Sequence, residues 1–223
     1  MKVVILCAGY ATRLYPKTLH TPKALLEYQG KKILDYLIED LKGYEIILVS
    51  NHKFYSLFLE YSKNKNIKVI DDGSTCNENR VGAGNDLILG LQDIEDDCLV
   101  MACDNLLDFS LSCFIEYFHI DRVTSIMCYK EKDEEKLKRT GQAVLCEDRV
   151  IGFKEKPNIS ISNYAVPPFY IFKKKDIKVI KGLKGNYDSL GSIIEKVVNK
   201  IQLKAFLMPG ERLDLGNLSP NKG

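Results

Sequence analysis

The stretch VVILCAGYATRLYPKTLHTPK, residues 3–23, decides the fold of this chain. It begins with the apolar run 3–6, which is typical of a strand buried on both faces of a sheet, and then enters a loop of small and polar residues at Ala8 and Gly9. In an open parallel sheet, ligands bind beyond the carboxyl ends of the strands, where loop N–H groups can point at phosphate oxygens. The stretch therefore predicts an α/β sheet with a phosphate-binding loop after its first strand.

Two cations and two small residues give this loop its expected chemistry. Gly9 and Ala11 allow a ligand to approach closely. The guanidinium of Arg13 can hold two phosphate oxygens at once, whereas Lys23 supplies a compact and movable charge. The pair suits a substrate whose phosphorus atoms carry changing charge.

The segment LCAGYATRLYPKTLHTPKALLEY, residues 6–28, resembles the signature of the nucleotidyltransferases that join a sugar 1-phosphate to a nucleoside triphosphate. The shared features are the small-residue loop, Thr-Arg-Leu, a proline, and then Pro-Lys. One departure is Ala11, where the family usually has a second glycine. The resemblance implies catalytic roles for Arg13 and Lys23, and nucleotide binding by Leu6, Ala8, Gly9, Ala11, Thr12 and Arg13.

Size and composition set the class of protein. The chain has 223 residues, 45% of them hydrophobic and 28% charged, which favours one large, soluble α/β domain. A net charge of +2 is too near neutral to imply a nucleic-acid partner. The seven cysteines form no C-x-x-C pair and their odd number favours a reducing cytoplasm, while no apolar run is long enough for a membrane span. We expect a cytoplasmic monomer or homodimer.

Strand and helix patterns alternate through the first half of the chain. We expect strands at residues 45–51, 67–70, 98–103 and 124–129, and helices at 33–41, 54–61, 85–91 and 111–118. Such alternation indicates βαβ units and a Rossmann-like, mostly parallel sheet flanked by helices. Residues 1–123 would form the nucleotide-binding part.

The polar loop at residues 71–84 is long enough to suggest a function. The segment ENRVGAGNDL resembles the small-residue stretch that holds the nucleobase in the family, which implies nucleotide binding by Asn79 and Gly82. A solvated loop position is the alternative for Asn79.

Asp104 follows the apolar run CLVMAC at the carboxyl end of the fourth predicted strand. By itself, an aspartate there is often a turn residue. ACDN, however, resembles the Gly-Asp-Asn of the family, with Cys103 in place of glycine, and the resemblance implies that Asp104 binds Mg²⁺ and is catalytic. Near the C-terminus, DLGN resembles the Asp-Ile-Gly-Thr of the family, so Asp214 would be the second carboxylate on Mg²⁺; Asn217 replaces the threonine.

From Gln142 the pattern changes, and residues 124–217 would form the acceptor-binding part. Short strands at 143–147, 150–154 and 164–172 predict a small antiparallel insertion lying over the sheet as the second wall of a cleft, followed by helices at 177–183 and 192–198 and a strand at 203–207. GFKEKP resembles the Glu-Lys-Pro motif of the family, which implies that Glu155 contacts a sugar hydroxyl and Lys156 the sugar phosphate. We also expect Gly141 and Tyr170 on the acceptor side.

These features favour a Mg²⁺-dependent transferase that takes a nucleoside triphosphate and a sugar 1-phosphate. Short relatives that transfer CMP to phosphocholine or to an aminoalkylphosphonate are an alternative, since Tyr164, Phe169, Tyr170 and Tyr187 could enclose a cationic head group. A silent nucleotide-sugar sensor is another, although the chain retains the expected cations and carboxylates. A glycosyltransferase would need an Asp-x-Asp, and Asp104 is followed by Asn105 and Leu106. Neither the base nor the sugar can be chosen from the sequence.

Overall fold

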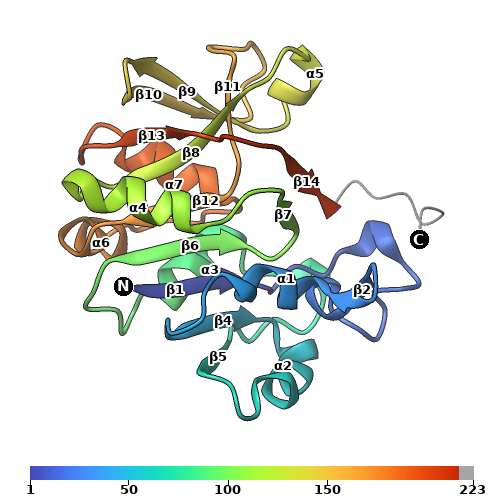
Figure 1. Ribbon diagram of the computed structural model, residues 1–223. Coiled ribbons are helices and arrows are strands. Elements are labelled where there is room, and N and C mark those ends of the chain that lie inside the picture. Colours follow the sequence, from blue (N-terminus) through green and yellow to red (C-terminus); the bar gives the residue numbers. More distant parts are fainter. Residues whose placement is uncertain (216–223) are drawn as a thin grey trace.

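The computed structural model describes residues 1–215, so Gly216 and Asn217 lie outside the described residues. Its first half contains a parallel sheet, in which β1 lies between two neighbours and Val4 is in register with Ile47 and Val100. Its strands are β6 (Cys98–Ala102), β1 (Lys2–Leu6), β4 (Ile46–Ser50) and β5 (Ile67–Asp71), in that spatial order. The carboxyl ends of these strands meet at one edge of the sheet, where the predicted loop begins (Figure 1).

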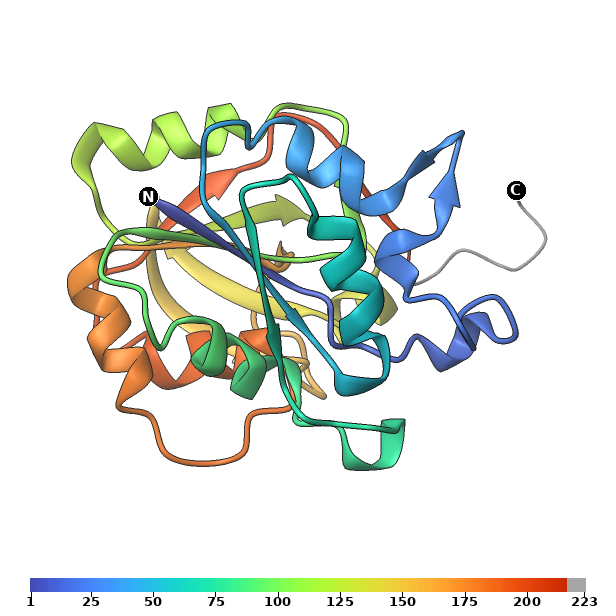
Figure 2. The same cartoon turned by 90° about the horizontal axis from the view of Figure 1, so that it is seen from below.

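Helices cover both faces of the sheet (Figure 2). Val3 and Ile5 of β1 pack into one apolar core, and Val4 and Leu6 into the other, which is why the strand is apolar at every position. The first core includes α1 (Ile33–Glu39), α2 (Tyr55–Ser62) and α4 (Ser112–Asp121); the second includes α3 (Ala83–Gly90), α6 (Lys174–Lys181) and α7 (Leu190–Val197). The α/β class is thus confirmed.

The second half of the chain extends the same sheet with mixed pairing. An antiparallel strand, β12 (Phe169–Phe172), joins β6 to β8 (Ser125–Lys130), and β13 (Lys204–Leu207) runs parallel to β8. Beyond β13 the order is β10 (Arg149–Glu155), β9 (Gly141–Cys146) and β11 (Tyr164–Val166), all antiparallel.

The expected antiparallel strands therefore exist, but they differ from the prediction in their attachment. They continue a ten-stranded sheet instead of lying over it, and parallel pairing is restricted to the β6-β1-β4-β5 group and to β8 with β13. These strands join the main sheet at two places: Arg149 of β10 pairs with Lys204 of β13, and β11 pairs with Lys130 and Tyr129 of β8. A strand pattern gives no information about such a distant partner.

Two small sheets complete the sheet structure. β2 (Glu27–Tyr28) pairs with β3 (Lys31–Lys32), after a 3₁₀ turn at Lys23–Leu25. β7 (Asn105–Leu107) pairs with β14 (Arg212–Asp214), which places Asp214 in register with Asn105. This second pairing brings the C-terminal end of the described chain to the end of β6.

The dense charge run at residues 130–139 forms a short surface helix, α5 (Glu134–Leu137). The Asp133 carboxylate caps it by accepting hydrogen bonds from the N–H groups of Glu135 and Lys136. Within residues 1–215, no helix combines the length and the apolar character needed to cross a bilayer.

Candidate active site

A cavity of about 360 Å³ opens at the carboxyl ends of β1 and β6. All of the nucleotide-binding residues expected in the first loop line it, namely Leu6, Ala8, Gly9, Ala11, Thr12 and Arg13. Lys23, Cys103 and Asp104 line it as well, together with Ala83 and Asp86 from α3. The structure thus brings together residues from three separate segments of the chain, including the three predicted catalytic residues.

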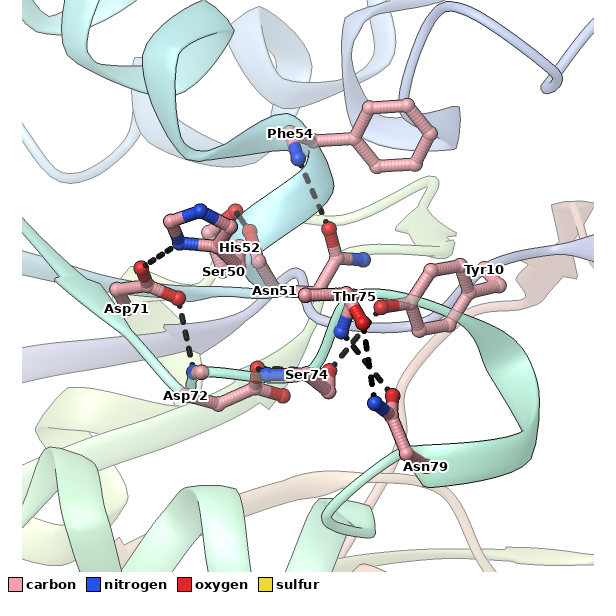
Figure 3. A network of polar contacts seen from close by, with 11 residues as sticks. Tyr10, Ser50, Asn51, His52, Phe54, Asp71, Asp72, Ser74, Thr75 and Asn79 are labelled. Carbon is pink, nitrogen blue, oxygen red and sulfur yellow. Dashed lines mark hydrogen bonds and ion pairs between the residues drawn. The ribbon is translucent and has the colours of Figure 1, made fainter.

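Buried groups hold the first loop in place. The side-chain amide of Asn51 donates to the Ala8 carbonyl at 2.8 Å, and its oxygen accepts from the Phe54 N–H at 3.0 Å (Figure 3). Ala11 has a left-handed backbone with φ of 48°, and the Thr18 hydroxyl donates to its carbonyl at 2.9 Å. A Cβ atom built on Gly9 meets nothing within 4 Å, so open space for a ligand lies over this loop.

Lys23 and Asp104 form an ion pair inside the cavity, with 3.1 Å between Nζ and Oδ2. The lysine side chain is only 7% exposed, whereas the aspartate side chain is 36% exposed and open to a ligand. The other oxygen of Asp104 accepts from the Asn105 amide at 2.7 Å. Arg13 is exposed at the rim. This arrangement places one buried and one exposed cation beside a carboxylate.

Asp214 lies next to Asp104 because β14 pairs with β7. The Leu215 N–H donates to the Asp104 carbonyl at 2.9 Å, and the Arg212 guanidinium contacts both Asn105 and the Asp214 carboxylate. Two carboxylates are the hard oxygen ligands that Mg²⁺ prefers. Among residues 1–215, no three acidic, histidine or cysteine side chains form a metal-binding group. The two aspartates supply oxygens of this kind, and the Mg²⁺ site stays a prediction.

Asn79 and Gly82 do not line the cavity, in contrast to the residues of the first loop. The side chain of Asn79 closes its own turn, accepting from the N–H groups of Thr75 and Cys76 and donating to the Thr75 hydroxyl (Figure 3). Gly82 has a φ of 97°, and a Cβ there would lie 2.9 Å from the Asp188 Cα. The prediction for these two residues stays a prediction.

The first turn of α3 offers few free N–H groups to a phosphate. The N–H groups of Ala83, Gly84 and Asn85 donate to the carbonyl oxygens of Tyr187 and Asp188 at 3.0–3.2 Å. Anion binding at a helix N-terminus needs unpaired donors. The first turn of α3 is therefore a poor anion site.

The sequence analysis missed Asp86, a buried carboxyl on the cavity wall. Its residue is 5% exposed, and its Oδ1 is the one buried side-chain oxygen or nitrogen in residues 1–215 without a hydrogen-bond partner. Burial and the charge of Asp72 raise its pKa to about 8. No sequence motif signals it, because its environment depends on contact with a distant loop.

The predicted acceptor residues lie together on the other half of the sheet. Gly141 of β9 is in register with Glu155 of β10, and Lys156 follows with 3.7 Å between its Nζ and the Glu155 Oε1. Burial raises the pKa of Glu155, although Lys156 opposes the shift. Tyr170 is buried on β12, where burial and then the charge of Glu155 raise its pKa well above the usual value.

Glycines surround the Glu155 carboxylate. A Cβ on Gly191 would lie 1.8 Å from Oε2, and one on Gly141 would lie 2.9 Å from it. The backbone N–H of Glu155 donates to the Glu195 carboxylate at 3.0 Å, which ties the end of β10 to α7. The carboxylate thus occupies a narrow site that larger residues at either glycine would close.

A larger cavity, of about 630 Å³, lies elsewhere, between α1 and the β7–β14 pair. Of the residues considered for a nucleotide or acceptor site it contains only Phe169, one of the four aromatic residues named for a cationic acceptor. The smaller cavity, which holds the convergent cations and carboxylates, is therefore the better candidate for chemistry.

Two curated proteins match nearly the whole of this chain. The chain is 25% identical over 224 residues to the UTP–glucose-1-phosphate uridylyltransferase AglF of Haloferax volcanii, covering 97% of this chain and 91% of AglF. It is 26% identical over 222 residues to the bifunctional protein GlmU of Methanocaldococcus jannaschii, covering 97% of this chain but only about half, 51%, of GlmU.

Solved structures share the fold. A UDP-glucose pyrophosphorylase complexed with UDP-glucose superposes with a TM-score of 0.81 at 19% identity, covering 97% of this chain and 93% of that chain. An inositol-1-phosphate CTP transferase from T. maritima superposes with a TM-score of 0.77 at 18% identity, covering 96% and 88%. The family model described as nucleotidyl transferase matches residues 2–220. With a match over nearly its whole length, the chain belongs to the nucleotidyl transferase family.

Proposed function

We propose that this chain transfers a nucleoside monophosphate from a nucleoside triphosphate to a sugar 1-phosphate, giving a nucleoside diphosphate sugar and pyrophosphate. The observation that carries the proposal is the meeting of Arg13 and Lys23, from the stretch after β1, with Asp104, from the end of β6, around one cavity. Family membership supports nucleotidyl transfer. The similarity to AglF, which is named as a glucose-1-phosphate uridylyltransferase, supports a sugar phosphate over phosphocholine as the acceptor.

The first loop would bind the triphosphate. Its backbone passes close to open space at Gly9, so N–H groups there can contact phosphate oxygens. Arg13, exposed at the rim, would hold the departing pyrophosphate, and the buried Lys23 would neutralise the α-phosphate as charge develops. A charge buried to this degree acts in a low dielectric and is stronger than a solvated one.

Asp104 and Asp214 would hold Mg²⁺, for which their oxygens are suitable ligands. When bound, the ion supplies positive charge between two anionic reactants and aligns them. The Lys23 contact keeps the Asp104 carboxylate oriented, and the Asn105 amide fixes its second oxygen.

The acceptor would bind at Glu155 and Lys156. A carboxylate in a narrow site is a good acceptor for a sugar hydroxyl, and an adjacent ammonium suits a phosphate monoester. No general base is needed, because a phosphate monoester is largely ionised near neutral pH and its oxygen is already a nucleophile. That oxygen attacks the α-phosphorus, the bond to the bridging oxygen of the β-phosphate breaks, and pyrophosphate leaves.

The proposal is tested by measuring pyrophosphate release with Mg²⁺, offering each nucleoside triphosphate with pooled sugar 1-phosphates or with phosphocholine. Release that requires sugar phosphates supports the proposal. Release with phosphocholine alone would move the chain to the cytidylyltransferase branch. Absence of release with every pair would contradict catalysis and favour a sensing role.

A further inference from the structure

Asp86 carries an unexplained polar group into the nucleotide cavity. Asp86 lies on α3 and is only 5% exposed. It lines the same cavity as Gly9, Lys23 and Asp104. No group among residues 1–215 donates a hydrogen bond to its Oδ1. Buried polar atoms without partners are rare in native proteins, so both oxygens of this carboxyl call for hydrogen-bonding groups.

The Asp72 carboxyl faces the Asp86 carboxyl and, after burial, is the cause of the raised pKa of Asp86. Asp72 itself accepts hydrogen bonds from the N–H and the hydroxyl of Ser74, both at 2.7 Å, and the Tyr10 hydroxyl contacts Ser74 at 3.2 Å (Figure 3). Two carboxyl groups can share a hydrogen bond only if one of them carries a proton. Asp72 has donors that stabilise its charge and Asp86 has none, so the proton belongs on Asp86.

The shared proton leaves Asp86 with one free acceptor. Its O–H donates to Asp72, which accounts for the fully buried Oδ1. The other oxygen, Oδ2, is not fully buried and accepts no hydrogen bond from residues 1–215, so it is the acceptor open to the cavity. A neutral acid also avoids adding a negative charge to the cavity in which a triphosphate would bind. The missing partner is therefore a hydrogen-bond donor on the uncharged part of the nucleotide.

The assignment of the donor for Asp86 to a nucleotide rests on the proposed function, which places a nucleoside triphosphate in the cavity. The phosphates are accounted for by the first loop, Arg13 and Lys23, which leaves the base for the wall formed by α3. Cytosine, guanine and adenine carry an exocyclic amino group that donates, whereas uracil and thymine have carbonyl oxygens on both sides of their single N–H. A fixed acceptor is repelled by those oxygens and satisfied by an amino group.

We propose that Asp86, supported by Asp72, reads the amino group of the nucleobase and makes this chain select an amino-bearing nucleoside triphosphate over uridine and thymidine triphosphates. Asp86 contacts the base, and Asp72 is a positioning residue that acts through it. The discrimination comes from the hydrogen bond that the amino group donates to Asp86. Uracil and thymine would place a carbonyl oxygen there, and two acceptors cannot pair.

The test compares kcat/KM for CTP, GTP, ATP, UTP and dTTP in the pyrophosphate assay, with melting-temperature shifts for each nucleotide alone. We expect the best amino-bearing base to exceed both UTP and dTTP by about 10-fold or more. Asp86→Ala should reduce that ratio by about 10-fold or more. Asp86→Asn should keep it, because the amide N–H₂ donates to Asp72 while its oxygen still accepts from the base.

Asp93→Asn is the matched control, since Asp93 is 79% exposed and paired with Lys68 outside the cavity. It should leave the base ratio unchanged. A wild-type preference for UTP or dTTP, an unchanged ratio in Asp86→Ala, or loss of the ratio in Asp86→Asn would each overturn the proposal. If Asp86→Ala does not fold, Asp86→Ser gives the same comparison.

The two proposals fail in distinguishable ways. Pyrophosphate release with UTP as the best substrate would support nucleotidyl transfer and overturn the role of Asp86. If no triphosphate is turned over, nucleotidyl transfer fails, and the melting-temperature shifts still decide base selection: a larger shift with an amino-bearing nucleotide that Asp86→Ala abolishes supports it, and equal shifts overturn it.

Discussion

Gly191→Ala should remove acceptor binding while leaving the fold intact. Gly191 lies in the first turn of α7, and an added Cβ would come within 1.8 Å of the Glu155 Oε2 and 2.6 Å of its Cδ. Carbon and oxygen atoms need more than about 3 Å, so the carboxylate must move by about 1 Å or more. The backbone of Glu155 is held by Glu195, so the side chain takes up the movement.

The expected size of the effect follows from this displacement. Misplacing a group that positions a substrate by about 1 Å can cost about 100-fold in rate, so kcat/KM for the sugar 1-phosphate should fall by about that factor. The KM for the triphosphate should not change, because Gly191 is not on the nucleotide cavity. Replacing a helical glycine by alanine gains up to about 1 kcal/mol, which offsets the strain on the displaced carboxylate.

The assay is steady-state pyrophosphate release with the sugar phosphate varied at saturating triphosphate. Gly182→Ala is the matched control, since a Cβ there meets its nearest atoms at 3.5 Å, an ordinary contact with the Lys178 and Val179 carbonyls. If Gly191→Ala folds and keeps the wild-type KM and kcat for the acceptor, the reasoning that places Glu155 in the acceptor site is refuted.

Three further predictions concern single side chains. Asp104→Ala should lower turnover with Mg²⁺ by at least about 100-fold without loss of circular-dichroism signal, and wild-type rates would contradict the metal assignment. Lys156→Ala should raise the KM for the sugar phosphate by about 10-fold or more and leave that for the triphosphate unchanged; equal changes in both would contradict an acceptor role. The folded-state pKa of Asp86 is raised from 3.8 to about 8. Between these values the folded chain keeps a proton that the unfolded chain has lost, so wild-type stability should fall as pH rises. Asp86→Asn cannot titrate at this position, so its stability should not fall in this way. The difference between its melting temperature and that of the wild type should therefore rise from pH 5 to pH 8, and a difference that does not change with pH would contradict the shared proton.

Residues next to the ends of the central strands were predictable from the sequence. The apolar runs before Ala8 and before Asp104 indicate neighbouring buried strands, and the carboxyl ends of parallel strands meet at one edge. That reasoning, with the family resemblance, was enough to place Arg13, Lys23 and Asp104 on a common cavity, as the structure does. The local sequence pattern and the fold class are therefore enough to predict which residues meet at the carboxyl ends of the central strands.

Long-range contacts were not predictable in the same way. The antiparallel hairpin was recognisable, but its pairing through Arg149 and Lys204 joins segments that no local pattern connects. The amide side chain of Asn79 is of a kind that can bind a nucleobase, yet its hydrogen bonds are made within its own turn. Asp86 has the pattern of an ordinary polar residue of a helix, and only the folded structure buries its carboxyl beside Asp72, where burial first and then the charge of Asp72 raise its pKa to about 8.

The segment at residues 187–191 links the two halves of the candidate site. Carbonyl oxygens of Tyr187 and Asp188 accept from the first N–H groups of α3, which carries Asp86. The Ser189 side chain caps α7 by accepting from the Ser192 N–H, and Gly191 two residues later abuts the Glu155 carboxylate. A Cβ on Gly84 would lie 2.8 Å from the Ser189 carbonyl, so α3 and this segment are packed without spare room. The distance between a base held at α3 and a sugar held at Glu155 is therefore fixed by one short, fully hydrogen-bonded connection. An in-line reaction needs that distance to be constant, because the attacking oxygen must reach the α-phosphorus along a single direction. Gly84→Ala should accordingly impair the reaction with both substrates, in contrast to Gly191→Ala, whose effect should be confined to the acceptor.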